Sequence, residues 1–221
     1  MNTKLPRLLQ LVSPSLPIGG YTYSQGIEWA VDEGWIRDQA GLSDWLQGLM
    51  ETSLLYLEVP VLQRLMRAWQ RHDELAVKRW SQFLLANRET LELRQEEKNR
   101  ARALAQLLVS LEPGAEPYKT LLSDTQHAAF SFACQRWQID EDAAATALVW
   151  GWLENQVLSA VKIIPLGQTA GQQLLFELAP RIEGIIERAR DIADDDLGAS
   201  SMALAIASSR HETLYTRLFR S

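Results

Sequence analysis

The stretch AAATALVWGWLENQVLSAV, residues 143–161, decides the fold class of this chain. Apolar side chains fall on nearly every face of the helix that it would form, including Leu148, Trp150, Leu153 and Val157. A helix that is apolar all round needs other elements on every side. We therefore expect a long apolar helix in the middle of a helical bundle.

The segments upstream of this stretch also have the periodicity of helices. One face of the first segment would gather apolar side chains at helical spacing: Val61, Leu62, Leu65, Met66 and Trp69. Trp80, Phe83 and Leu84 form a similar face, and residues 88–111 make a long helix-favouring run that Pro113 and Gly114 end. No alternating β-pattern of useful length and no hairpin signal appears. The sequence predicts one all-α domain over residues 1–221.

Local signals set the expected ends of these helices. Asp73, Asp124 and Asp140 stand where N-caps would open the helices that follow, and Ser24 is expected to cap a helix containing Ile27. Two segments should interrupt the helical pattern, because both contain proline and glycine. They are Ser13–Gly20 and Ile163–Gly167.

Composition excludes several classes of function. With 221 residues, 47% apolar and 23% charged, the chain is typical of a globular protein, and no apolar run is long enough to span a membrane. A net charge of −6 argues against nucleic-acid binding. The chain has one cysteine, Cys134, in an apolar setting, so we expect a buried, inert thiol, no internal disulfide and a cytoplasmic location.

The sequence offers little for catalysis. It has no GxxxxGK phosphate loop, and His72, His127 and His211 are scattered without metal-ligand spacing. The acidic cluster at Asp191 and residues 194–196 is interpreted as a solvated loop. We expect no catalytic residue, no metal site and no tightly bound cofactor in this chain.

The last residues, 208–221 (SSRHETLYTRLFRS), concentrate arginine and aromatic side chains in a tail without an evident apolar face. Such side chains anchor protein interfaces, so the tail is expected to be flexible and to bind a partner. The alternative is a solvated end with no function. The expected partner-binding residues are Arg210, His211, Glu212, Tyr215, Arg217, Phe219 and Arg220.

Two more charged residues stand out by their surroundings. Glu28 lies in an aromatic setting with Tyr21 and Tyr23, where it is either partly buried or an ordinary first-turn carboxylate. Lys162 lies among apolar side chains before Pro165. Its ammonium group must reach solvent or pair with a carboxylate, either on another chain or within this one, where Glu154 is conceivable.

Four blocks of this sequence resemble the urease accessory protein UreF family. They are LPIGGYTYSQGIEWA at residues 16–30, RETLELRQEE at 88–97, VKIIPLGQ at 161–168 and SRHETLYTRLFRS at 209–221. The blocks keep the family's order and span most of the chain, and the last is the most specific. Ile27, Ala101 and Leu214 depart from the residues usual in the family.

This resemblance implies an all-helical homodimer that helps to load nickel into urease. Such a protein joins the accessory protein UreD (also called UreH), recruits the GTPase UreG and acts on the urease apoprotein, while the complex handles nickel and GTP. The tail from Arg210 to Arg220 would become ordered against UreD/UreH, and Lys162 matches a position linked to control of the GTPase. Tyr21, Tyr23, Ser24 and Glu28 would belong to an interface or core loop.

Two rival interpretations come from other classes of protein. A small all-α enzyme would hold a ligand among Tyr21, Tyr23, Glu28 and a histidine, and it requires that these side chains converge on one open pocket. A helical ligand-sensing regulator is the third possibility, although the sequence contains no basic DNA-reading helix.

Overall fold

The computed structural model of the chain describes residues 3–198 and 200–221, and within them regular structure is helical and no strand occurs. The all-α prediction is confirmed. The α-helices are α1 (Lys4–Val12), α2 (Ile27–Asp32), α3 (Gln39–Leu49), α4 (Val59–Gln70), α5 (Glu74–Ala86), α6 (Leu91–Leu111), α7 (Lys119–Leu122), α8 (Gln126–Arg136), α9 (Glu141–Ile163), α10 (Gln168–Leu178), α11 (Arg181–Arg190) and α12 (Met202–His211). The 3₁₀ segments are η1 (Gly20–Thr22), η3 (Pro113–Tyr118) and η4 (Asp194–Asp196), and η2 (Met50–Glu58) is a π-helix.

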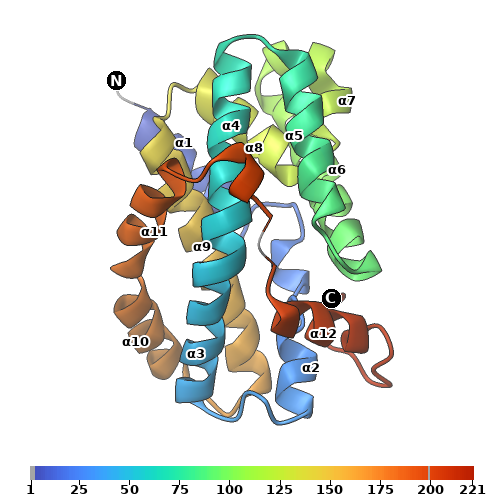
Figure 1. Ribbon diagram of the computed structural model, residues 1–221, viewed down its shortest axis with the longest axis vertical. Coiled ribbons are helices and arrows are strands. Elements are labelled where there is room, and N and C mark those ends of the chain that lie inside the picture. The colour runs from blue at the N-terminus through green and yellow to red at the C-terminus, as the bar shows by residue number, and fades with distance from the viewer. Residues whose placement is uncertain (1–2, 199) are drawn as a thin grey trace.

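Two long columns run through the molecule (Figure 1). One is α9, which contains residues 143–161 and packs against α1, α2, α3, α4, α10 and α11. The other consists of α3, η2 and α4, which follow one another without a break. A π-helix is rare and frequently occurs at functional sites. Here it ends at Glu58, a buried carboxylate.

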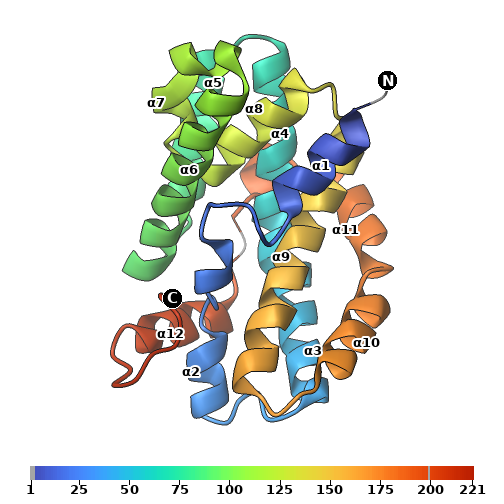
Figure 2. The same ribbon diagram turned by 180° about the vertical axis from the view of Figure 1, so that it is seen from behind.

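The apolar side chains gather in two hydrophobic cores. The first core surrounds α4 and α8 and includes Leu62, Leu104 and Phe130. The second core lies around α2, α3, α10 and the later half of α9, with Ile27 and Leu153 among its members. Fully burying one such side chain stabilises the fold by about 1.5–3 kcal/mol. Both columns contribute to both cores, and Figure 2 shows them running along the length of the molecule.

The expected helix ends are partly confirmed. The Asp73 carboxylate accepts the Ala76 N–H, and the Asp140 carboxylate accepts the Ala143 N–H, both as predicted. The prediction for Asp124 is wrong. Thr125 caps α8 instead, because its backbone is extended and its hydroxyl accepts the Ala128 N–H at 3.1 Å.

Ser24 does not occupy the N-cap of α2. Gly26 does, with a positive φ of 81°, and α12 packs so closely there that a Cβ atom on Gly26 would lie 2.9 Å from that of Ala207. The Ser24 hydroxyl still accepts the Glu28 N–H at 3.4 Å.

The two predicted interruptions are present. Residues 13–19 form no regular helix, and α9 ends at Ile163, before Pro165. Cys134 is buried, and this burial raises the pKa of its thiol. None of the described helices is long and apolar enough to cross a membrane.

Candidate functional site

The tail is docked on the body of the protein. After α12, residues 212–221 fold back against α2 and α6, where Phe219 is only 6% exposed and Ser221 is buried. The prediction of a flexible tail without a face to bury is therefore wrong. A search for helical periodicity could not find this docking, because it uses one apolar side chain and many polar contacts instead of an apolar stripe.

Glu28 is the main acceptor for the docked tail. It lies in the first turn of α2, and its carboxylate accepts the Leu218 N–H at 2.6 Å and the Phe219 N–H at 2.9 Å. Its Oε2 also lies 3.1 Å from His211 Nε2. Hydrogen bonds to a carboxylate are stronger than those between neutral groups. Of the two interpretations of Glu28, partial burial is the one that the structure supports, at 9% exposed.

His211 joins α2 to α6 through its imidazole ring. The ring is fully buried, with Nδ1 2.7 Å from Glu92 Oε2 and Nε2 facing Glu28. Both nitrogens can donate to these carboxylates only when the ring carries two protons. Glu92 also accepts from Arg217 Nη1 at 2.6 Å. The histidine is thus a structural link and has no free nitrogen for a ligand.

The end of the tail is held from two sides. The Ser221 carbonyl oxygen accepts the backbone N–H of Ser24 at 2.6 Å and of Gln25 at 3.0 Å, and the Ser24 hydroxyl at 2.7 Å. On the other side, the Ser221 hydroxyl donates to Glu96 at 3.2 Å. The Arg220 N–H donates to the Thr22 carbonyl at 2.8 Å. Ser24 therefore binds the tail as well as α2.

The predicted tail residues divide into two groups. His211 and Phe219 point inward, and Arg217 pairs with Glu92 while 41% of its side chain stays exposed. Glu212 accepts the Leu91 N–H at the start of α6. The outward group consists of three predicted residues, Arg210, Tyr215 and Arg220, together with Leu218, which was not predicted; Tyr215 is fully exposed and Leu218 is 64% exposed.

Lys162 lies next to the docked tail. Its side chain is exposed, and Nζ lies 5.5 Å from the centroid of the Phe219 ring, within the range of a cation–π contact. Among the described residues it forms no ion pair, so the proposed pairing with Glu154 does not occur. The ammonium group reaches solvent.

Tyr21 and Tyr23 do not form a pocket with Glu28. Tyr21 is 56% exposed, whereas Tyr23 is 4% exposed and its carbonyl accepts from Asn155. Glu28 and His211 do converge, but in a packed setting that the tail fills. The requirement of the enzyme interpretation, an open pocket at these side chains, is not met.

A buried cluster of four charged residues was missed at the sequence level. Arg88 contacts both Glu58 and Glu97, with Nη2 at 3.0 Å from Glu58 and 2.7 Å from Glu97. His127 Nε2 lies 3.0 Å from Glu58, and its Nδ1 lies 3.9 Å from Glu97. Neither pair of atoms meets the geometry of a hydrogen bond. We call Glu58, Arg88, Glu97 and His127 the charged quartet. The sequence did contain a signal for this cluster. Glu58 is a charged residue within an apolar run, and the same pattern singled out Lys162.

In the quartet, the attraction between opposite charges shifts the pKa values more than burial does. Burial acts to raise the pKa of Glu58, but the charge of Arg88 and the contact with His127 lower it to about 2. The same balance lowers the pKa of Glu97. Burial acts to lower the pKa of His127, but Glu58 and Glu97 raise it to about 9. At neutral pH the quartet therefore holds two positive and two negative charges.

A cavity of about 120 Å³ adjoins the quartet. All four quartet residues line it, together with Gln25 and Glu96 from the tail-docking region, Trp152 of α9 and Leu204 of α12. Within the described residues, no group of three or more His, Cys, Asp or Glu side chains is arranged to hold a metal ion.

These features define a class: an all-helical protein whose distinctive site is a docked tail with an outward-facing side. The chain belongs to the urease accessory protein UreF family, whose model matches residues 36–179. It is 48% identical to the urease accessory protein UreF of Pseudomonas putida (strain W619), over the full length of both chains. It is also 46% identical to that of Alkalilimnicola ehrlichii, covering 97% of this chain and 95% of the relative, and 42% identical to that of Enterobacter sp. (strain 638), covering 100% and 99%.

Proposed function

We propose that this chain is a scaffold for urease maturation. It binds UreD/UreH through its docked tail, recruits and regulates the GTPase UreG, and supports nickel insertion into the urease apoprotein. The observation that carries the proposal is the two-sided tail: its inner side is fixed by Glu28 and His211, and its outer side leaves Tyr215 and Leu218 exposed. Exposed aromatic and arginine side chains on a fixed backbone suit an interface, because little conformational freedom is lost on binding.

The proposed contact residues follow from the outward group. Arg210, Tyr215, Leu218 and Arg220 touch the partner directly, whereas His211, Glu212, Arg217 and Phe219 support them from below. Lys162 presents an exposed positive charge beside the tail and is proposed to act in control of the GTPase.

The scaffold is proposed to perform no bond chemistry and to bind neither nickel nor GTP tightly. The family and the closed setting of Glu28 and His211 support this part of the proposal. We also propose a cytoplasmic homodimer. An exposed apolar side chain away from the tail, Phe176 at 83%, leaves surface for a second copy.

Co-expression with UreD/UreH and UreG, followed by size-exclusion chromatography, tests the proposal. We expect this chain to elute with UreD/UreH, and UreG to join only when this chain is present. The isolated chain should neither retain Ni²⁺ through gel filtration nor hydrolyse GTP. Separate elution of this chain and UreD/UreH, or metabolite turnover by the isolated chain, would contradict the scaffold function.

A further inference from the structure

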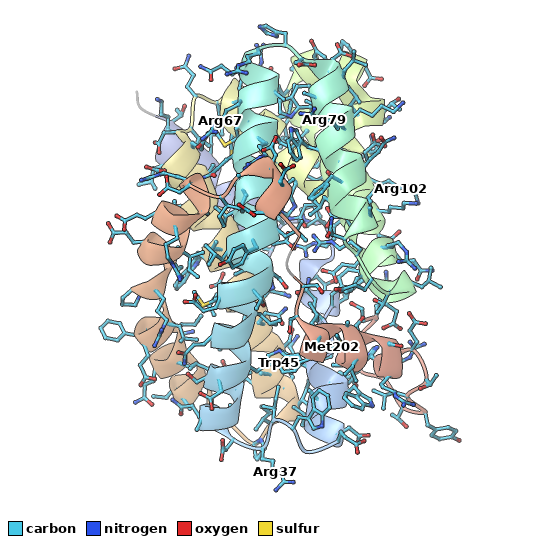
Figure 3. All side chains as sticks on the ribbon, viewed as in Figure 1. Arg37, Trp45, Arg67, Arg79, Arg102 and Met202 are labelled. Atoms are coloured by element: carbon cyan, nitrogen blue, oxygen red, sulfur yellow. The ribbon has the colours of Figure 1, made fainter. Side chains whose placement is uncertain are left out.

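The helix α6 separates its charged side chains by sign. The carboxylates of Glu92, Glu96 and Glu97 are buried, and each binds partners in the tail or in the interior. Lys98 and Arg102 instead lie on the outer face, where both side chains are exposed, and Figure 3 shows Arg102 at the edge of the molecule. All three carboxylates of α6 thus face inward, so they do not balance the positive charge of the outer face.

Arg94, Lys98 and Arg102 form a row of like charges along α6. Because they follow one another at intervals of four residues, neighbouring members of the row lie on one side of the helix, where like charges repel and destabilise it. Arg94 is held by the backbone, since its Nη1 donates to the Arg88 carbonyl at 2.6 Å. Among the described residues, Lys98 and Arg102 form neither an ion pair nor a side-chain hydrogen bond. The row is therefore unfavourable in the isolated chain, and negative charge from a partner would relieve the repulsion.

The carboxylates near this row do not neutralise it. Burial raises the pKa of the Asp124 carboxyl, while the charges of Lys78 on α5 and of Lys98 act to lower it. Asp124 thus lies close to two lysines and is shared between them. Two further carboxylates, those of Glu89 and Glu212, lie at the beginning of α6, before the row, and Glu212 accepts a backbone N–H there. The outer face of α6 therefore keeps a positive charge.

The outer face of α6 continues into the outward side of the tail. A cleft runs between them, and its lining includes Gln95 and Asn99 of α6 as well as Arg217 and Arg220 of the tail. Gln95 is exposed and stands three residues before Lys98, so the two side chains share one face of α6. The cations of the tail and those of α6 therefore belong to one surface. We call its cationic residues the basic face: Lys78, Arg94, Lys98, Arg102, Arg217 and Arg220.

The remainder of the molecule has the opposite charge. The chain carries a net charge of −6 although the basic face contributes only positive charge, so the other residues are strongly acidic in sum. In Figures 1 and 2, α11 lies on the opposite side of the molecule from α6. Its exposed carboxylates include Glu183 and Glu187, and Asp191 follows directly. Because complementary charge steers association, an acidic partner is drawn to the basic face and repelled by the rest of the surface.

We propose that the basic face binds an acidic surface of the partner that binds the tail. The identity of this partner, UreD/UreH, rests on the proposed function, whereas the charge that it must present follows from the basic face. Leu91 and Leu218 are exposed within the same surface, at 53% and 64%. Such apolar side chains suit a protein partner better than the phosphate backbone of a nucleic acid. The tail thus supplies apolar anchors, and α6 orients the partner and speeds the encounter.

Reversing one charge in the row tests this inference. Lys98→Glu places a carboxylate four residues from Arg94 and from Arg102, so the unfolding midpoint should not fall, while the Kd for UreD/UreH should rise about tenfold at about 50 mM NaCl. At about 500 mM NaCl the difference should shrink below about twofold, because salt screens exposed charges. Arg181→Glu on α11 is the control, since it makes the same change in net charge at an exposed site and should leave the Kd unchanged. An unchanged Kd for Lys98→Glu, or an equal rise for Arg181→Glu, overturns the inference.

A second probe decides the inference if the unchanged chain does not bind UreD/UreH, a result that would itself contradict the proposed function. A fluorescent polyglutamate peptide of about ten residues, titrated into the isolated chain at low salt, should bind about fivefold more weakly to Lys98→Glu than to Arg181→Glu. Equal binding to both variants, or tighter binding of a single-stranded oligonucleotide of equal charge that Lys98→Glu abolishes, then overturns the inference. If Tyr215→Ala/Leu218→Ser loses UreD/UreH while Lys98→Glu binds it normally, the proposed function stands and this inference alone fails.

Discussion

Glu28 and Phe219 lie 191 residues apart in the sequence, yet the Glu28 carboxylate accepts the Phe219 N–H at 2.9 Å. This contact joins two blocks that resemble the family at opposite ends of the chain. It also explains a carboxylate in an aromatic setting, because the charge is satisfied by two backbone N–H groups and His211. The tail is consequently part of the fold.

Glu28→Gln should lower the free energy of unfolding by about 1–3 kcal/mol, because an amide replaces a buried charged acceptor. Urea unfolding followed by circular dichroism measures this change. Glu183→Gln makes the same substitution on an exposed face of α11. Its free energy of unfolding should lie within about 0.5 kcal/mol of that of the unchanged protein. Equal stability of the two variants would show that Glu28 does not hold the tail.

Arg88→Met should destabilise the protein more severely, by about 3–5 kcal/mol, because it leaves Glu58 and Glu97 buried without their main counter-charge. Thermal and urea unfolding measure the loss. Arg102→Met on the exposed side of the same region, labelled in Figure 3, is the control and should change stability little. A small effect of Arg88→Met would mean that the quartet is already open to water.

The quartet also predicts how stability depends on alkaline pH. His127 has a pKa of about 9 in the folded protein, against about 6.5 for an unperturbed histidine, so the folded state binds its proton more tightly. This contribution, up to about 3 kcal/mol, is complete below pH 6.5 and is lost as pH rises through 9. Urea unfolding at pH 6 and pH 10 should show the loss in the unchanged protein and a much smaller one in His127→Gln. Parallel pH profiles for the two proteins would contradict the assignment.

Much of the fold was predictable from local sequence, and the two largest failures share a cause. The helix that contains residues 143–161, the break at Pro165 and the caps at Asp73 and Asp140 all depend on neighbours in the chain. The docking of Phe219 and the quartet depend on polar partners far apart in sequence, which periodicity does not reveal. The cap at Asp124 failed by one residue, because Thr125 offers the same chemistry next to it.

Lys162→Ala should leave stability within about 0.5 kcal/mol of the unchanged protein, because the ammonium group is exposed and its contact with Phe219 is a surface cation–π pair. Complex formation should also be unchanged, while GTP hydrolysis by the complete complex should change. Size-exclusion chromatography and phosphate release measure the two properties. Unchanged hydrolysis would remove Lys162 from the functional residues.

The central claim is that the outward side of the docked tail binds the partner. The most direct measurement is the Kd between this chain and UreD/UreH for the double variant Tyr215→Ala/Leu218→Ser, compared with Leu75→Ser on the exposed face of α5. Loss of two interface anchors should weaken binding by about 100-fold or more without changing the unfolding midpoint, and Leu75→Ser should bind normally. An unchanged Kd for the double variant would contradict the account.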